Sequence, residues 1–176
     1  MNQTIRFTAE DANKAGEEWG FNCGPGALCG VLVRTPDEMR PFMGDFEEKR
    51  YTNPTLMFEV LNRLGVSYRQ VYRGDVPSNM LPLDLGLVRI QWEGSWTREG
   101  VPMRARYRAT HWIGVRARGA EIFDVSATCA GGWIDYPQWR DQLVPWLLKE
   151  CVPKATGGWW PTHGIEIKLP TDPDKA

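Results

Sequence analysis

One cysteine in this chain stands where a turn runs into a predicted helix, a setting that activates a thiol. Residues 22–32 read Asn-Cys-Gly-Pro-Gly-Ala-Leu-Cys-Gly-Val-Leu, and Pro25 suits the first turn of a helix because its missing N–H would have no partner there. Cys23 then lies at or just before the N-cap, facing unpaired backbone N–H groups and the positive end of the helix dipole. This environment favours the nucleophilic thiolate. The alternative interpretation is a buried small hydrophobic residue.

A cysteine nucleophile requires a nearby base, and imidazole is the usual one. Of the two histidines, His111 opens the predicted strand 110–115, which precedes Asp124 in the predicted strand 121–125. Residues that face each other across an antiparallel hairpin point to the same side of the sheet. A two- or four-residue loop therefore keeps His111 and Asp124 together, whereas a three-residue loop with one bulge separates them. If the two side chains lie on the same side, Asp124 would fix the tautomer of the His111 imidazole. If they do not, Asp124 is a solvent-facing aspartate.

The second histidine offers a rival pair. His163 precedes the last predicted strand, and Glu166 follows three residues further on. Residues three apart in a strand point to opposite faces, so Glu166 is badly placed to orient the His163 imidazole. We therefore interpret His163 as a structural histidine and keep the His163–Glu166 site as the minor alternative.

The other cysteines indicate neither a metal site nor a disulfide framework. Cys29, Cys129 and Cys151 form no Cys-x-x-Cys pair among themselves or with Cys23, and such pairs are typical of structural zinc sites. We accordingly predict no metal and no cofactor. Cys29 lies well inside the helix that begins near Cys23, and we expect it to pack in the core.

Three successive helices are each marked by a proline near their start. The first runs from Pro25 to about residue 33, and its small residues predict the close approach of another element. The second begins at the capping box Thr35-Pro36-Asp37-Glu38 and runs to about residue 43. The third begins at Asn53-Pro54, has apolar residues at helical spacing, and ends at Gly65.

Beyond residue 65 the pattern changes to strands and predicts an α+β fold. A polar and aromatic connection covers residues 93–109, and one further helix is expected at 137–149, with Trp139 and Trp146 on its apolar side. Residues 1–170 are read as one domain, followed by a polar tail at 171–176. The predicted strands are 66–72, 86–92, 110–115, 121–125 and 164–169.

Composition excludes several classes of protein. The chain has 176 residues, of which 42% are hydrophobic and 24% charged, and its net charge is −1. That balance argues against binding nucleic acid through bulk charge. No apolar run approaches the roughly 20 residues of a membrane span, and residues 1–18 are too polar for a secretory signal. We therefore expect a cytoplasmic protein without a membrane partner, and the sequence does not indicate its oligomeric state.

The segment Asn22-Cys23-Gly24-Pro25, followed by a helix of small residues, resembles the nucleophile segment of papain-like cysteine peptidases. Within them it is most similar to the C39-like, bacteriocin-processing branch. Residues 51–66 resemble the second helical region of that branch, and 110–115 and 122–125 resemble its histidine and aspartate strands, in the same chain order. The likeness extends from about Trp19 to Val125, and residues 126 onward show none.

The resemblance implies a papain-like α+β fold, in which the nucleophile helix packs on a C-terminal antiparallel sheet. It implies that Cys23 is the nucleophile, His111 the base and Asp124 the orienting acid. The family usually carries a glutamine a few residues before the cysteine, whose amide helps to bind the oxyanion. Glu17 stands about there in this chain, and a carboxylate would repel an oxyanion. Asn22 is the substitute candidate, beside the N–H of Cys23.

The implied function is a cysteine-dependent hydrolase of peptide or amide bonds, acting on a peptide or protein through a thioester. A deamidase or an acyltransferase would use the same triad, and a binding module on a decayed fold is the third alternative. Arg108, which follows alternating arginines, is a candidate for binding an acidic side chain or a C-terminal carboxylate. The alternative explanation of the same arginines is a solvent-exposed edge strand protected by charge. Trp92 and Trp112 are candidates for lining the cleft, and Trp112 alternatively packs behind His111.

Overall fold

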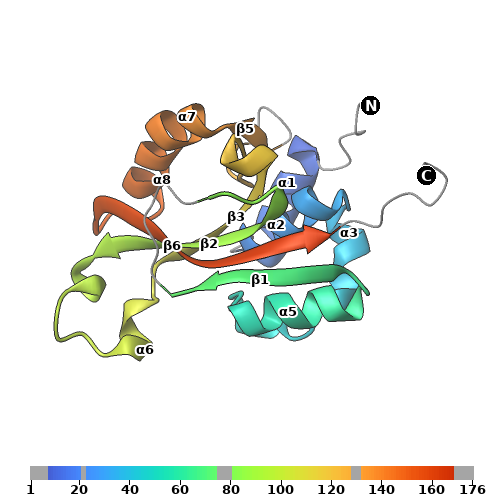
Figure 1. Cartoon of the computed structure of the whole chain (residues 1–176), viewed down its shortest axis with the longest axis horizontal. Helices are drawn as coiled ribbons and strands as arrows, with labels where there is room; N and C mark the ends of the chain where they lie inside the picture. The colour runs from blue at the N-terminus through green and yellow to red at the C-terminus, as the bar shows by residue number, and fades with distance from the viewer. Residues whose placement is uncertain (1–7, 21–22, 75–80, 128–131, 169–176) are drawn as a thin grey trace.

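The computed structural model, which describes residues 8–20, 23–74, 81–127 and 132–168, has N-terminal helices packed on a six-stranded antiparallel sheet. The strand order is β1-β6-β2-β3-β4-β5, so the last strand of the chain lies between the first two (Figure 1). The α+β class predicted from the order of helical and strand-like segments is confirmed. The predicted tail 171–176 lies outside the described residues.

Short helices precede the sheet, and the predicted caps begin two of them. Thr35 forms a capping box with Glu38, and the side chain of Asn53 accepts a hydrogen bond from the N–H of Leu56. Gly65 follows the second of these helices with a φ of +65°. No described helix is long and apolar enough to cross a membrane. The helices are α1 (Ala9–Trp19), α2 (Cys23–Leu32), α3 (Pro36–Met39), the 3₁₀ turn η1 (Arg40–Phe42), α4 (Phe46–Lys49) and α5 (Pro54–Arg63).

The strands differ from prediction mainly at their ends. β6 begins at Ala155, well before the predicted start at Gly164, and β4 ends at Phe123, so Asp124 directly follows the strand. β5 was not predicted. The strands are β1 (Ser67–Arg73), β2 (Leu85–Gly94), β3 (Thr110–Arg116), β4 (Glu121–Phe123), β5 (Trp133–Asp135) and β6 (Ala155–Lys168), and the connection from β2 to β3 contains η2 (Ser95–Thr97) and α6 (Met103–Arg106).

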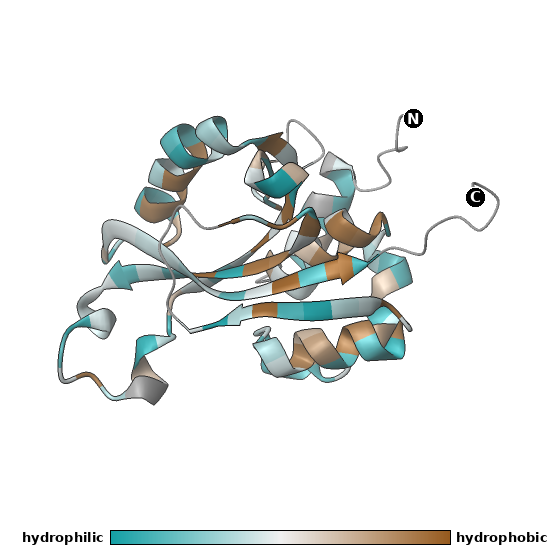
Figure 2. Ribbon diagram, in the orientation of Figure 1, coloured by the Kyte–Doolittle hydropathy of each residue, from teal (hydrophilic) through white to brown (hydrophobic). Residues whose placement is uncertain are grey.

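Both faces of the central strands are buried, whereas the edge strand β1 is largely exposed. One face packs against the N-terminal helices through side chains that include Leu87, Trp112 and Ile165. The opposite face, which includes Val88 and Ile113, packs against the C-terminal helices. Figure 2 shows hydrophobic residues along the central strands and on the helices beside them. Burial on both sides is reflected in the continuous apolar run at residues 85–88 of β2.

Helix α2 lies unusually close to the sheet because of its glycines. A Cβ at Gly26 would lie 2.9 Å from Val125, and one at Gly30 would overlap the ring of Phe123. Phe123 and Val125 flank Asp124, so this contact fixes the distance between α2 and the residue that follows β4. The predicted close approach to the small-residue flank of this helix is confirmed.

The C-terminal helical segment departs from regular α-helix. It comprises α7 (Tyr136–Gln138), a π-helical turn η5 (Trp139–Leu143) and α8 (Val144–Glu150). A π turn inserts an extra residue and rotates everything after it around the helix axis. Trp139 is fully buried, but Trp146 is 50% exposed. The prediction that Trp139 and Trp146 share the apolar side was therefore wrong, because it assumed an unbroken α-helical period.

Candidate active site

The β3–β4 hairpin brings His111 and Asp124 together. Arg116 pairs with Glu121, so residues 117–120 form a four-residue loop. This register places Asp124 diagonally across from His111 on the same side of the sheet. Nε2 of His111 lies 2.9 Å from Oδ2 of Asp124. The even loop length on which the pairing depends is confirmed.

The carboxylate of Asp124 is buried and fully hydrogen-bonded. Oδ2 accepts from His111 Nε2 and from Trp139 Nε1, each at 2.9 Å, and Oδ1 accepts from the backbone N–H of Ser126 at 3.0 Å. Burial by itself raises the pKa of this group, but the charge and hydrogen bond of His111, with the bonds from Trp139 and Ser126, lower it below its ordinary value. Asp124 is therefore held as a carboxylate.

Cys23 is the first residue of α2, and its thiol lies close enough to the His111 side chain for the two groups to interact. Because Nε2 of the imidazole faces Asp124, Nδ1 is the nitrogen that faces the sulfur. A backbone hydrogen bond from Trp112 also reaches Cys23. Burial opposes the thiolate, but the hydrogen bond and charge of His111 and the bond from Trp112 outweigh it, so the pKa of Cys23 lies below its ordinary value.

The imidazole is stabilised in its charged form by both neighbours. Burial lowers the pKa of His111, but the charge and hydrogen bond of Asp124, followed by those of Cys23, raise it well above its ordinary value. A lowered thiol pKa next to a raised imidazole pKa shifts the proton from sulfur toward nitrogen and favours a thiolate–imidazolium pair. The arrangement suits acyl transfer, because it places a thiol of lowered pKa beside an imidazole that can hold its proton and a carboxylate that can orient that imidazole.

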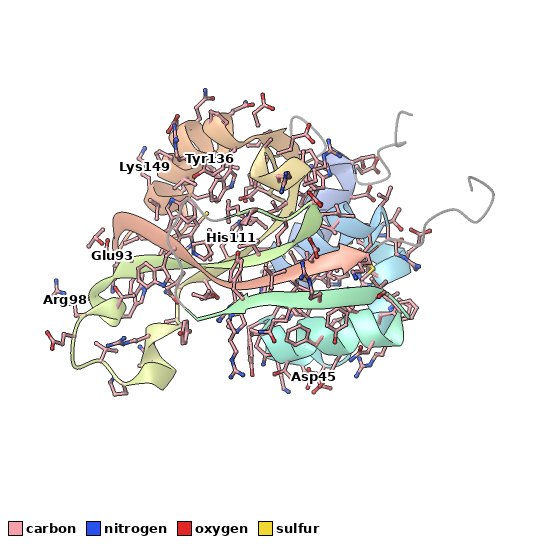
Figure 3. The ribbon with its side chains drawn as sticks, in the orientation of Figure 1. Asp45, Glu93, Arg98, His111, Tyr136 and Lys149 are labelled. Atoms are coloured by element: carbon pink, nitrogen blue, oxygen red, sulfur yellow. The ribbon has the colours of Figure 1, made fainter. Side chains whose placement is uncertain are left out.

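Aromatic packing holds the imidazole in place. The ring of Trp92 stacks on that of His111, with centroids 6.0 Å apart and planes inclined by 29°. In the view of Figure 3, His111 lies near the centre of the molecule, whereas Arg98 and Lys149 lie at its periphery. A ring confined in this way keeps Nε2 and Nδ1 directed at their two partners.

A cleft of about 750 Å³ opens beside the triad. It lies between the start of α2, the segment before α5, the start of β3 and the end of α8. Three arginines line it, and no aspartate or glutamate is among its described lining residues. The lining residues are Gly20, Cys23, 50–53, Arg89, Trp92, 107–112, Val125, Ser126, Leu147, Cys151 and Val152.

The predicted substrate-binding residues all border this cleft, but in different ways. Arg108 is exposed there. Trp92 is 2% exposed and stacks on the imidazole, so most of its surface is already in contact. Trp112 is 1% exposed, and its Nε1 donates to the carbonyl of Thr52 at 2.9 Å. The buried alternative for Trp112, packing behind His111, describes its environment better than a substrate platform does.

The two residues considered for the oxyanion site, Glu17 and Asn22, differ in what the structure says of them. Glu17 is exposed on α1 and is not among the described residues that line the cleft. Its carboxylate is therefore not placed to repel an oxyanion next to the sulfur. Asn22 lies outside the described residues. The first backbone N–H groups of α2 have no partner within the helix. They lie at the same end of the helix as the Cys23 sulfur, where they can donate hydrogen bonds to an anion.

The rival histidine pair does not form. Glu166 accepts hydrogen bonds from Arg69 on the neighbouring strand β1, the shorter of them at 2.8 Å. His163 lies opposite Arg89 across β6 and β2. Burial, followed by the charges of Arg89 and Arg73, lowers the pKa of His163 to about 4, so it is neutral at neutral pH. The structural interpretation of His163 agrees with this environment.

The other described cysteines have different environments from Cys23. Cys29 is fully buried in the core, and burial raises the pKa of its thiol far above the ordinary value, as expected for a packing residue. Cys151 is exposed at the end of α8, on the border of the cleft. Cys129 lies outside the described residues. Among the described cysteines, Cys23 is the one whose surroundings lower the thiol pKa and so favour the thiolate.

Among the described residues, no group of three His, Cys, Asp or Glu side chains gathers in a way that could hold a metal ion. No protein-family model matches the chain, and no curated protein matches it. The functional interpretation therefore depends on the fold and on the geometry around Cys23, His111 and Asp124.

Proposed function

We propose that this protein is a cysteine-dependent hydrolase of peptide or amide bonds that works through a thioester intermediate. Cys23 is its nucleophile, His111 its acid–base catalyst and Asp124 the residue that orients the imidazole. The observation that supports this most strongly is the chain of neighbouring groups from the Cys23 thiol to His111, and from Nε2 of His111 to Oδ2 of Asp124 at 2.9 Å. Such a chain is the recurring arrangement for nucleophilic acyl transfer.

The first half of the reaction forms the thioester. The thiolate of Cys23 attacks the carbonyl carbon, and the negative charge passes to the carbonyl oxygen. The free N–H groups at the start of α2 stabilise that oxyanion. The C–N bond then breaks as imidazolium His111 gives its proton to the leaving nitrogen, which departs as a neutral amine.

The second half releases the acid. Neutral His111 now takes a proton from water, and the resulting hydroxide attacks the thioester carbonyl. The C–S bond breaks, a carboxylic acid leaves, and the thiolate–imidazolium pair is restored. Throughout, Asp124 accepts the Nε2–H of His111 and keeps Nδ1 directed at the reacting atoms.

The architecture supports a papain-like identity for this enzyme. The nucleophile stands at the start of a helix that packs on an antiparallel sheet, and the histidine and aspartate follow on consecutive strands. This is the arrangement that the resemblance of residues 22–25 to C39-like peptidases implies. Glu17, the sequence feature that suggested a decayed binding module, lies exposed and outside the described lining of the cleft.

Turnover of a mixed peptide library by the wild-type protein and by Cys23→Ala tests the proposal. We expect the substitution to reduce turnover by about a million-fold, the usual cost of losing a triad nucleophile. Cys151→Ala, which removes a thiol at the border of the same cleft, serves as the matched control. Mass spectrometry of the products identifies the reaction: chain cleavage supports the hydrolase, and a gain of about one dalton without cleavage identifies a deamidase. Tight peptide binding without turnover by either protein would contradict the enzyme proposal.

A further inference from the structure

Arg89 is a buried cation beside the candidate nucleophile. It lies in the middle of β2, is 8% exposed, and lines the same cleft as Cys23. It is near enough to Cys23 for their charges to interact. Burying a charge without a counter-charge is costly. A cation in this position therefore requires an explanation.

The contacts of Arg89 within the described chain leave its charge uncompensated. One Nη2–H donates to the hydroxyl of Thr110 at 3.3 Å, and the guanidinium lies 5.3 Å from the ring centroid of Tyr107. Its Nε is buried and has no hydrogen-bond partner in the structure. No carboxylate among the described residues forms an ion pair with it. The aromatic contact covers one side of the guanidinium and leaves the donors in its plane unsatisfied.

The neighbours of Arg89 do not supply the missing anion. His163 faces it across β6, and its pKa of about 4 makes it a neutral group at neutral pH. Trp112 faces it across β3. The other charged residues that line the cleft, Arg50 and Arg108, are also cations. Apart from the Cys23–His111 pair, the charged residues among the described lining of the cleft are therefore all arginines.

We propose that Arg89 binds a carboxylate of the substrate, adjacent to the carbonyl that Cys23 attacks. The substrates are then peptides or amides with a carboxylate within about one residue of the reacting bond. That carboxylate is either the chain's own C-terminus or an aspartate or glutamate side chain. The planar donors of a guanidinium match a carboxylate in two-point hydrogen bonding. This inference rests on the proposed function, because it takes Cys23 as the reacting group.

The ratio of two alkylation rates at Cys23 tests the inference without any substrate. Iodoacetate carries a carboxylate next to its reacting carbon, and iodoacetamide is its neutral counterpart. The measured quantity is the iodoacetate-to-iodoacetamide rate ratio at Cys23, read by mass spectrometry, with Cys151 in the same protein as the internal reference. We expect the ratio at Cys23 to exceed that at Cys151. Arg89→Gln should lower the ratio at Cys23 by about tenfold to a hundredfold, the factor that corresponds to the loss of a hydrogen bond to a charged group.

A matched control and a variant-free measurement complete the test. Arg118→Gln removes the same charge from an 84% exposed side chain at the far end of β3 and should leave the ratio unchanged. If circular dichroism shows that Arg89→Gln does not fold, the inference is tested by a protection measurement on the wild-type protein. Acetate should then protect Cys23 from iodoacetamide in preference to the neutral acetamide. Equal protection by the two compounds contradicts the inference.

Failure of this inference and failure of the proposed function give different results. If Cys23 reacts quickly with iodoacetamide but its ratio equals that of Cys151 and is insensitive to Arg89→Gln, the Arg89 site is wrong and the enzyme proposal stands. If Cys23 reacts no faster than Cys151, the enzyme proposal fails, and the ratio still reports on Arg89. Peptide pairs then distinguish the carboxylate source: a free against an amidated C-terminus, and glutamate against glutamine beside the cleaved bond.

Discussion

Trp139 donates a hydrogen bond through Nε1 to Oδ2 of Asp124 at 2.9 Å, and so joins the C-terminal helical segment to the candidate triad. The same oxygen accepts from His111. Trp139 is fully buried and begins the π-helical turn η5. We interpret it as a positioning residue: it holds the carboxylate in place and ionised, and does not reach the reacting atoms.

Trp139→Phe keeps the aromatic bulk and removes this one donor. A hydrogen bond to a charged group contributes about 1.5–3 kcal/mol, so we expect kcat to fall by roughly tenfold with little change in KM. Loss of the bond also raises the pKa of Asp124, because Trp139 is one of the groups that lower it. The acid side of the activity profile should therefore move to higher pH. A purely structural role would lower Tm and leave that profile where it is.

The reactivity of Cys23 should persist at a pH where an ordinary thiol is protonated. Its pKa lies below the usual value because the bond and charge of His111 outweigh burial, so the rate of alkylation should decline only at a pH below that lowered pKa. His111→Ala removes the two largest effects that lower the pKa of Cys23 and leaves burial, which raises it, with only the Trp112 backbone bond opposing. The acid limb of the alkylation profile should therefore move to higher pH in this variant.

The comparison with Cys29 provides the internal contrast for that profile. Burial raises the pKa of Cys29 far above its ordinary value, so it should remain unlabelled across the whole range in the folded protein. Labelling of Cys23 and Cys29 at equal rates would contradict the assignment of a special thiol. Labelling is read peptide by peptide, so the two sites are resolved in one experiment.

Asp124→Asn tests the orienting role with almost no change in shape. The amide cannot stabilise an imidazolium and favours the wrong tautomer, so turnover should fall by about 10⁴-fold, as in other triads. Asp84→Asn is the control, because Asp84 is 79% exposed and lies 3.8 Å from Arg118, away from the cleft. If Asp124→Asn retains most of the wild-type kcat, the triad assignment is wrong.

Much of the site was predictable because its geometry follows from local rules. The position of Cys23 at the start of a helix follows from a proline in its first turn, although α2 begins at Cys23 itself and not at Pro25 as predicted. The pairing of His111 with Asp124 follows from loop parity in one hairpin. Both depend on residues close in the sequence. The caps at Thr35 and Asn53 were predicted correctly for the same reason.

What sequence analysis missed depends on contacts between distant segments. The Trp139 bond to Asp124 requires the C-terminal helices to fold back over the sheet, and a tryptophan in an apolar pattern looks like an ordinary core residue. Arg89 within an apolar strand was the available signal for a buried cation, because an arginine there is costly unless it has a partner. The early part of β6 was missed because Pro161, which cannot donate to a ladder, lies at a register shift.

The glycines of α2 provide a final test of how the nucleophile is positioned. In an ordinary helix, Gly→Ala stabilises by about 1 kcal/mol, but a Cβ at position 26 would lie 2.9 Å from Val125 Cγ2. We therefore expect Gly26→Ala to destabilise the protein by about 1–3 kcal/mol, measured by urea unfolding. Because Val125 directly follows Asp124, the displaced contact should also lower kcat.

Val125→Ala in the same chain separates crowding from other effects of the new methyl group. It removes Cγ2, the nearest atom to the new methyl group, and leaves Val125 Cβ at 3.0 Å. The crowding is therefore relieved in part, and the double variant should be more stable than the sum of the two single changes allows, by about 1 kcal/mol. The gain in kcat relative to Gly26→Ala should follow the gain in stability, because both arise from the return of α2 to its place against the sheet. Strict additivity of the two changes would show that α2 does not depend on this contact for its distance from Asp124.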